Sequence, residues 1–109
     1  MIQHKELGAG RWNQLSFCEQ MANVGSEVER TILWKAKGNP GYSIRAFERA
    51  LELLDFTISD LKNSKRLKEI VRVREALADH FYFDNEYQST DASWHNYFFC
   101  FNYAARVNR

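Results

Sequence analysis

The segment at residues 39–58, NPGYSIRAFERALELLDFTI, decides the fold because it carries the clearest helical pattern in the chain. Large apolar residues recur in it at alternating steps of three and four, which places them on one face of an α-helix. These residues are Ile44, Phe47, Leu51, Leu54 and Ile58. Asn39 can cap such a helix, and Pro40 suits its first position. We therefore predict an amphipathic helix that begins at Pro40.

A similar pattern comes before this segment. Ser16 and Glu19 have the spacing of a capping box, and one apolar face follows: Phe17, Met21, Val24, Val28 and Ile32. Gly25 lies on the same face, where glycine costs up to ~1 kcal/mol in helix propensity. We expect a close helix crossing at Gly25 to compensate. The pattern ends at Lys37 and Gly38.

Two further helices are predicted after residue 60. Asn63 or Ser64 can cap the first, whose inward face is Leu67, Ile70, Val71, Leu77, Ala78 and Phe81. Ser89 or Thr90 can cap the last, whose main stripe is Trp94, Phe98, Phe101 and Ala105. Short connections favour antiparallel neighbours. The sequence thus predicts an all-α protein, an up-down bundle of about four helices, as one domain over residues 1–109 with a flexible arm at 1–11.

The composition is that of a folded protein in a reducing compartment. Apolar residues make up 45% of the chain and aromatic residues 15%, which is enough to fill a core. The formal charge of +1 excludes a strong net attraction to nucleic acid or membrane. Cys18 and Cys100 lie in separate helical patterns and read as buried, reduced thiols. With no leader and no apolar run long enough to span a bilayer, we expect a cytoplasmic protein that does not bind membrane.

The last helix has more apolar surface than one core requires. Phe99, Cys100, Tyr103 and Val107 fall on the side opposite its main stripe. The helix is therefore either central and buried on most sides, or it offers Phe99, Tyr103 and Val107 as a homodimer interface. The sequence leaves both interpretations open.

Arg74 falls within the predicted apolar stripe of its helix. A buried guanidinium needs a paired carboxylate, and the available partners are Asp55, Glu48 and Glu29. This predicted buried polar cluster is either a structural ion pair that fixes helix register or part of a functional pocket. Removing one partner of a buried pair costs about 3–5 kcal/mol.

No catalytic or cofactor signature is found. None of the three histidines follows a glutamate by three residues, the step that di-metal bundles use, and no glycine-spaced phosphate loop is present. We expect no metal and no cofactor, and the sequence favours a protein that is not an enzyme. The basic run Lys62–Arg74 is either a solvated helix face or a phosphate-binding surface in which Lys65, Lys68 and Arg72 share an outward side.

The segment from Arg74 to His80, REALADH, resembles the Arg-x5-His motif of the HEPN domain family. Members of that family are small helical bundles, commonly dimeric, and some cleave RNA with an arginine and a histidine that meet across the dimer. The resemblance implies Arg74 and His80 as catalytic residues. His80 lies about 120° around the helix from Arg74, which argues against a joint role.

A broader stretch of the chain resembles small uncharacterised prokaryotic all-α proteins. The similar segments are 11–13, 21–30, 46–55 and 103–106. This resemblance implies a stand-alone bacterial or archaeal protein and no particular activity. The sequence as a whole predicts a non-enzymatic bundle that acts through self-association or a protein partner. The alternative is an RNA-binding protein of HEPN type, or a metal-independent ribonuclease.

Overall fold

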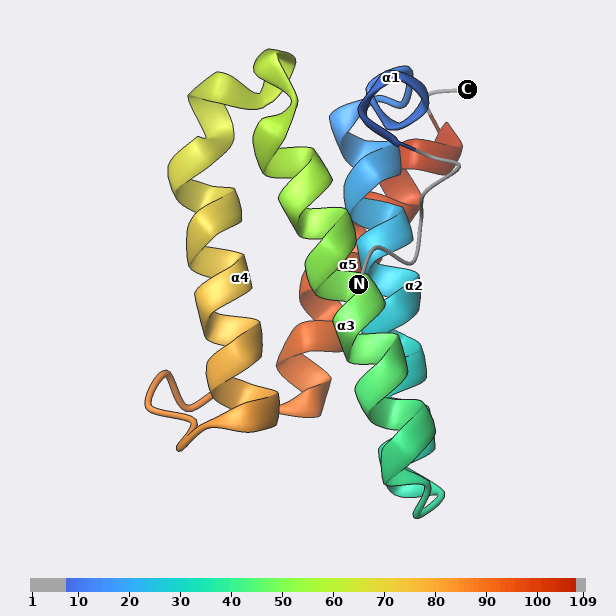
Figure 1. Cartoon of the computed structure of the whole chain (residues 1–109), viewed down its shortest axis with the longest axis vertical. Coiled ribbons are helices and arrows are strands. Elements are labelled where there is room, and N and C mark those ends of the chain that lie inside the picture. Colours follow the sequence, from blue (N-terminus) through green and yellow to red (C-terminus); the bar gives the residue numbers. More distant parts are fainter. Residues whose placement is uncertain (1–7, 108–109) are drawn as a thin grey trace.

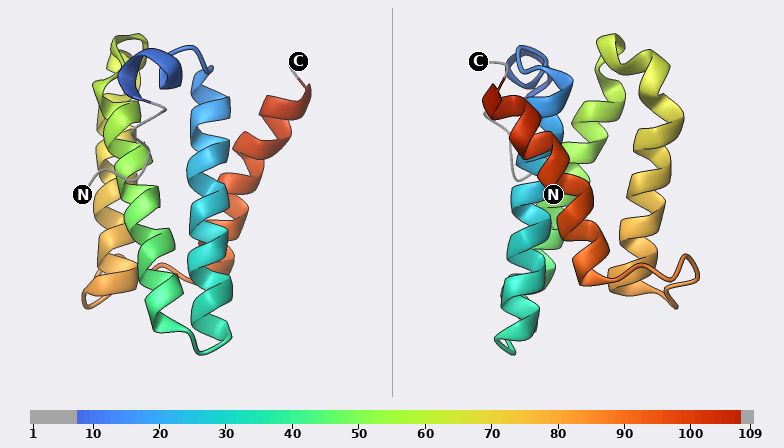
Figure 2. Two further views of the ribbon diagram at one scale, coloured as in Figure 1. Left: turned by 45° about the vertical axis from the view of Figure 1, so that its right-hand side comes forward. Right: turned by 180° about the vertical axis from the view of Figure 1, so that it is seen from behind.

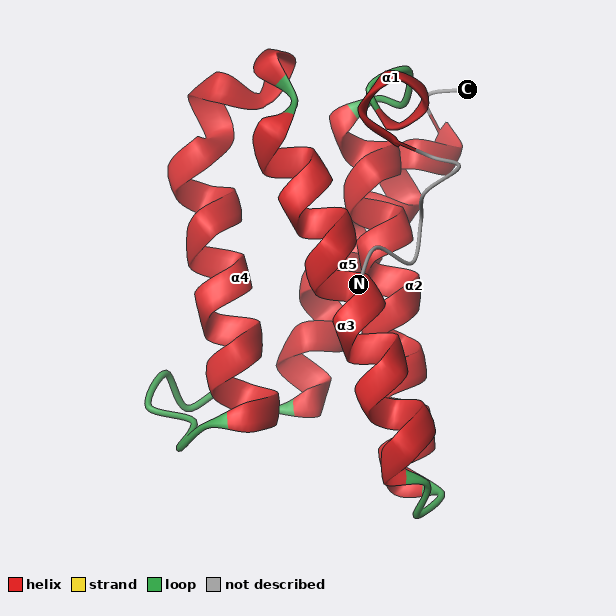
Figure 3. Cartoon of the chain, viewed as in Figure 1, coloured by secondary structure: helices red, strands yellow, loops and turns green. Residues whose placement is uncertain are grey.

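Four long helices and two short ones follow one another along residues 8–107, the part of the chain that the computed structural model describes (Figure 1). They are α1 (Gly8–Trp12), α2 (Phe17–Ala36), α3 (Pro40–Ser59), the 3-10 helix η1 (Leu61–Arg66), α4 (Leu67–Tyr82) and α5 (Asp91–Val107). These residues contain no strand (Figure 3). Successive long helices run in opposite directions. The predicted all-α, up-down bundle is confirmed.

Side-chain caps fix where three of the long helices begin. The Ser16 hydroxyl accepts from the Glu19 amide at 3.1 Å, and the Glu19 carboxylate accepts from the Ser16 amide at 2.9 Å. The Asn39 side chain accepts from the Tyr42 amide at 3.0 Å, so α3 begins at Pro40 as predicted. The Thr90 hydroxyl caps α5 by accepting from the Ser93 amide, also at 3.0 Å.

The main contacts between the long helices run in the order α4, α3, α2, α5, and the series folds back so that Tyr97 of α5 bonds to Glu69 of α4. The largest contact is between α2 and α3, followed by that between α2 and α5, while α4 packs on α3 (Figure 2). The best-buried apolar side chains lie along these contacts and include Met21, Val24, Val28, Phe47, Leu54, Ile70 and Leu77. Burial of such side chains supplies most of the stabilisation of a bundle.

The crossing of α2 and α5 depends on Gly25. A Cβ atom at this position would lie 2.7 Å from Cβ of Phe98 and 3.0 Å from its Cγ. The predicted close helix crossing at Gly25 is therefore confirmed. Since the nearest atom is a Cβ, a change of the Phe98 rotamer cannot relieve the contact, and the two helices would have to move apart.

We expect Gly25→Ala to destabilise the protein. Overpacking costs about 1–3 kcal/mol, against a gain of about 1 kcal/mol in helix propensity, so a net loss of about 1 kcal/mol should result. Urea unfolding followed by far-UV circular dichroism measures it. Ser26→Ala, at the exposed neighbouring position, is the control and should change little. A variant more stable than the wild type would contradict the close crossing.

A buried polar network joins the N-terminal segment to the corner between α3 and α4. The Gln20 amide donates to Asp60 at 2.8 Å and to the Trp12 carbonyl at 3.1 Å. Asn63 donates to the Gln20 side-chain oxygen at 2.8 Å. The Trp12 indole donates to the Thr57 hydroxyl at 3.1 Å. The bonds from Gln20 to Asp60, from Asn63 to Gln20 and from Trp12 to Thr57 each join residues at least 40 positions apart.

This network corrects two predictions. Residues 8–12 form helix α1, and Trp12 is fully buried, so the predicted arm at 1–11 does not extend through them. Residues 1–7 lie outside the described part. Asn63 does not cap α4, because its side chain is buried in η1 and bonded to Gln20.

Asp60 gives the network a pH dependence. Burial alone would raise the pKa of Asp60, but hydrogen bonds from Lys62 and Gln20 outweigh burial and hold the pKa below its ordinary value of 3.8. A pKa lowered by folding means that the carboxylate stabilises the fold above pH 3.8. That contribution is lost as the pH falls through the lowered value.

We expect Asp60→Asn to unfold more easily at about pH 7, by about 1–3 kcal/mol, because it removes a buried, charge-assisted interaction. The difference from the wild type should shrink as the pH falls from 3.8 through the lowered value, below which Asp60 is protonated in both the folded and the unfolded state. Urea unfolding of both proteins across this range measures it. A difference that stays constant with pH would show that Asp60 does not act through its charge.

The connection between α4 and α5 is held by one carboxylate. Buried Asp79 accepts from the Glu86 amide at 2.8 Å and from the Tyr87 amide at 3.0 Å. The Asn85 side chain donates to the Ser89 carbonyl at 2.8 Å. These bonds set the loop that leads into α5.

Candidate interaction surfaces

Helix α5 presents three large apolar side chains to solvent. Phe99, Tyr103 and Val107 are 56%, 63% and 60% exposed, respectively. The inner side of α5 buries Trp94 and Phe98. The helix lies on the outside of α2 (Figure 2), so the alternative of a central helix buried on most sides is wrong. Cys100 is exposed on this helix as well, and Cys18 is half-buried, which corrects the expectation of two buried thiols.

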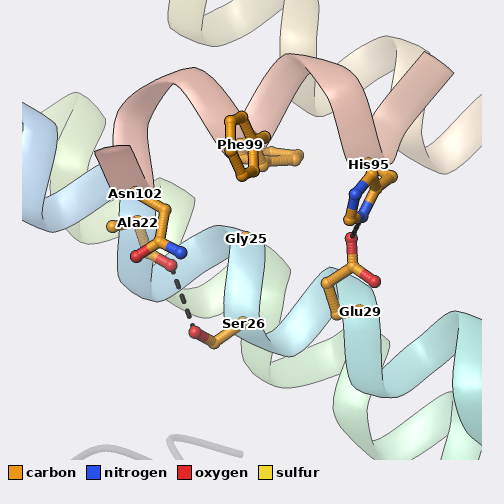
Figure 4. A pocket seen from close by; sticks show the side chains of 8 residues that line it. Ala22, Gly25, Ser26, Glu29, His95, Phe99 and Asn102 are labelled. Atoms are coloured by element: carbon orange, nitrogen blue, oxygen red, sulfur yellow. Dashed lines mark hydrogen bonds and ion pairs between the residues drawn. The ribbon is translucent and has the colours of Figure 1, made fainter. Parts of the chain in front are cut away.

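A small pocket of about 220 Å³ lies between α2 and α5 (Figure 4). At one end, Nδ1 of His95 lies 2.7 Å from a carboxylate oxygen of Glu29. The pocket's Ser26 hydroxyl donates to the Ala22 carbonyl of its own helix at 3.3 Å. The arrangement therefore lacks the hydrogen bond between nucleophile and base that acyl-transfer catalysis requires.

The predicted buried polar cluster around Arg74 does not form. The guanidinium bonds to Asp55 through two nitrogens, at 2.8 and 3.3 Å, but the two side chains are 37% and 56% exposed. Glu48 is exposed, and Glu29 pairs with His95 instead. The reason is that the buried stripe of α4 is Ile70, Val73 and Leu77. Arg74 lies at its edge, and its long stem carries the charge to the surface. Such an exposed pair is worth about 0–1 kcal/mol.

Arg74 and His80, the catalytic residues of the HEPN interpretation, face different neighbours within the chain. Arg74 points to Asp55 on α3. His80 lies with Nε2 2.9 Å from the carboxylate of Asp91, at the start of α5. The structure does not bring the two side chains together in one site.

One buried carboxylate of the bundle lies on α2, where the sequence did not lead us to expect it. Glu27 is buried and accepts from Arg30 at 2.8 Å and from Arg49 of α3 at 3.0 Å. The available signal was that Glu27 is followed directly by Val28 and lies beside the apolar stripe of α2. The Glu27–Arg49 pair links α2 and α3, the two helices that share the largest contact.

A groove of about 520 Å³ separates α4 from α5. Its lining includes Lys68, Glu69, Arg72 and Val73 of α4 together with Trp94 and Tyr97 of α5. Two of the three predicted phosphate contacts, Lys68 and Arg72, therefore stand at its rim, while Lys65, also exposed, does not line it. The groove exists because α4 packs on α3 and α5 packs on α2 (Figure 2).

Two side chains give this groove unusual polar character. The Tyr97 hydroxyl donates to Glu69 at 2.9 Å. Burial, and next the bond to Glu69, raise the pKa of Tyr97 well above its usual range, so the hydroxyl stays a donor. The indole N–H of Trp94, a residue only 6% exposed, has no hydrogen-bond partner among the described residues. A buried donor left without an acceptor costs about 1–3 kcal/mol.

Metal chemistry and membrane insertion receive no positive indication from the described residues. Within residues 8–107, no group of three or more His, Cys, Asp or Glu side chains is placed to hold a metal ion. Over the same residues, no helix combines the length and the apolar character needed to cross a bilayer.

No family model, curated protein or solved structure matches the chain. The described residues present two candidate interaction surfaces, the outer face of α5 and the α4–α5 groove.

Proposed function

We propose that the protein is a non-enzymatic helical bundle that acts by pairing with a second copy of itself through the outer face of α5. The observation that carries the proposal is the exposed stripe of Phe99, Tyr103 and Val107. These residues are spaced at four-residue steps, so they lie along one side of the helix. Exposed aromatic residues gathered in this way are typical of protein interfaces.

An antiparallel pairing of two α5 helices suits the charges of this face. Asp91 lies at the N-terminal end of α5 and Arg106 near its C-terminal end. A two-fold axis near Phe99 would bring the acidic end of one helix to the basic end of the other, and it would oppose the helix dipoles. A single helix stripe buries less area than a large obligate interface. We therefore expect a reversible dimer whose population rises with concentration.

Phe99→Ala combined with Tyr103→Ala should shift this equilibrium towards monomer without loss of helical content, because both side chains face solvent in the single chain. Light scattering at several protein concentrations measures the mass, and circular dichroism measures the helix. Tyr87→Ala removes a comparably exposed aromatic residue outside α5 and is the matched control. An unchanged mass for the double variant, or a monomeric wild type at every concentration, would sink the proposal.

Disulfide cross-linking is a second test of the same interface. Cys100 is exposed next to Phe99, so a two-fold axis near Phe99 would place the two Cys100 thiols near each other. A Cys18→Ser variant should form a disulfide-linked dimer on mild oxidation, and a variant that lacks Cys100 as well should not. Unpaired thiols also fit the proposed cytoplasmic location. A partner protein is the alternative occupant of this face.

RNA binding of HEPN type is the second candidate function, favoured by the exposed cations Lys65, Lys68 and Arg72. In this hypothesis, Arg74 and His80 would act with residues of the second copy. Single-stranded RNA should then be cleaved in the presence of a chelator, and His80→Ala should abolish cleavage. His95→Ala, which removes an exposed histidine of α5, is the control. Intact RNA, or equal cleavage by the two variants, would exclude the ribonuclease.

A further inference from the structure

The groove between α4 and α5 has the layout of a small-molecule site. Its volume of about 520 Å³ lies in the range of ligand pockets, which bury most of a small organic molecule. Val73 and Trp94, both buried, and Ala76, half-buried, supply apolar walls. An indole wall beside small aliphatic side chains favours a flat, apolar ligand body.

The charged residues at the rim of the groove favour a ligand that carries an anionic group. Lys68 and Arg72 lie one helical turn apart on α4, so both heads can reach one anionic group. Glu69 also lines the groove, and its carboxylate accepts from the Tyr97 hydroxyl. Two cations and one carboxylate leave a single net positive charge. This balance matches a monoanion better than a doubly charged phosphate.

Trp94, which lines the groove, also carries a polar group. Its N–H is buried and has no acceptor among the described residues. The indole N–H of Trp12, by contrast, donates to the Thr57 hydroxyl. An acceptor atom brought beside Trp94 would satisfy this donor, at the same wall that contacts the ligand body.

We propose that the α4–α5 groove binds a small aromatic monocarboxylate. The ring system lies against Val73 and Trp94, and the carboxylate lies between Lys68 and Arg72. This site is independent of the proposed dimer interface, because Trp94 and Tyr97 lie on the side of α5 opposite Phe99 and Tyr103. Failure of either proposal therefore leaves the other standing.

The test uses 2-naphthoate and its neutral isostere 2-naphthylmethanol with the full chain labelled with ¹⁵N. Spectra resolve the indole N–H signals of the three tryptophans, and Trp94→Phe assigns the signal of Trp94. We expect 2-naphthoate to shift the Trp94 indole signal and amide signals along α4. 2-Naphthylmethanol should bind about tenfold more weakly, since it lacks the charge. Absence of shifts at millimolar ligand, or equal binding of both probes, would overturn the proposal.

Charge variants locate the carboxylate. Arg72→Ala and Lys68→Ala should each weaken 2-naphthoate by about tenfold and leave 2-naphthylmethanol unchanged. Both residues are exposed, so the variants should keep the wild-type spectrum. Lys65→Ala is the matched control, because Lys65 lies outside the groove lining, and it should bind 2-naphthoate normally. Equal weakening by Lys65→Ala, or shifts confined to the Phe99 face, would show general anion attraction or another site and overturn the assignment.

Discussion

The placement of α5 depends on the absence of a side chain at Gly25. A Cβ there would meet Phe98 at 2.7 Å, so glycine is what allows the two helices to approach. Once Phe98 is seated, the helical repeat turns Phe99 and Tyr103 to solvent and Trp94 towards α4. The exposed aromatic face and the α4–α5 groove both follow from this one contact. The cost in helix propensity at Gly25 is thus offset by a tertiary contact.

Polar groups define the ends of the bundle, while apolar packing fills its middle. Asp60, Gln20 and Asn63 satisfy one another at the corner between α3 and α4, and Trp12 closes over them. Glu27 ties α2 to α3 through Arg49. A buried network of this kind stabilises only when its members are all bonded. The network therefore favours one arrangement of the N-terminal segment, whereas it contributes little hydrophobic stabilisation.

Features that depend on neighbouring residues were predictable from sequence. The Ser16–Glu19 capping box and the Asn39 cap act over three residues. The apolar stripe of α3 was predicted only in part, because Phe47 and Leu54 are buried but Ile44 is exposed. Arg74 was misplaced because the width of a buried stripe depends on how many helices pack against it, and α4 packs mainly on α3. Trp12 was not predicted to be a core residue, because its partner, Thr57, is 45 residues away. The groove was not predictable from sequence, because it depends on the incomplete packing of α4 against α5.

The loop held by Asp79 also bears on how the chain reaches its fold. The α2–α3 contact joins consecutive helices and can form early, whereas α5 must return to α2 across most of the chain; His95 and Glu29 are 66 residues apart. Closing so long a loop costs conformational entropy. By fixing the turn after α4, Asp79 reduces the number of directions that α5 can take. Asp79 belongs to neither proposed binding surface. It nevertheless reduces the number of conformations that the chain samples before Phe98 meets Gly25.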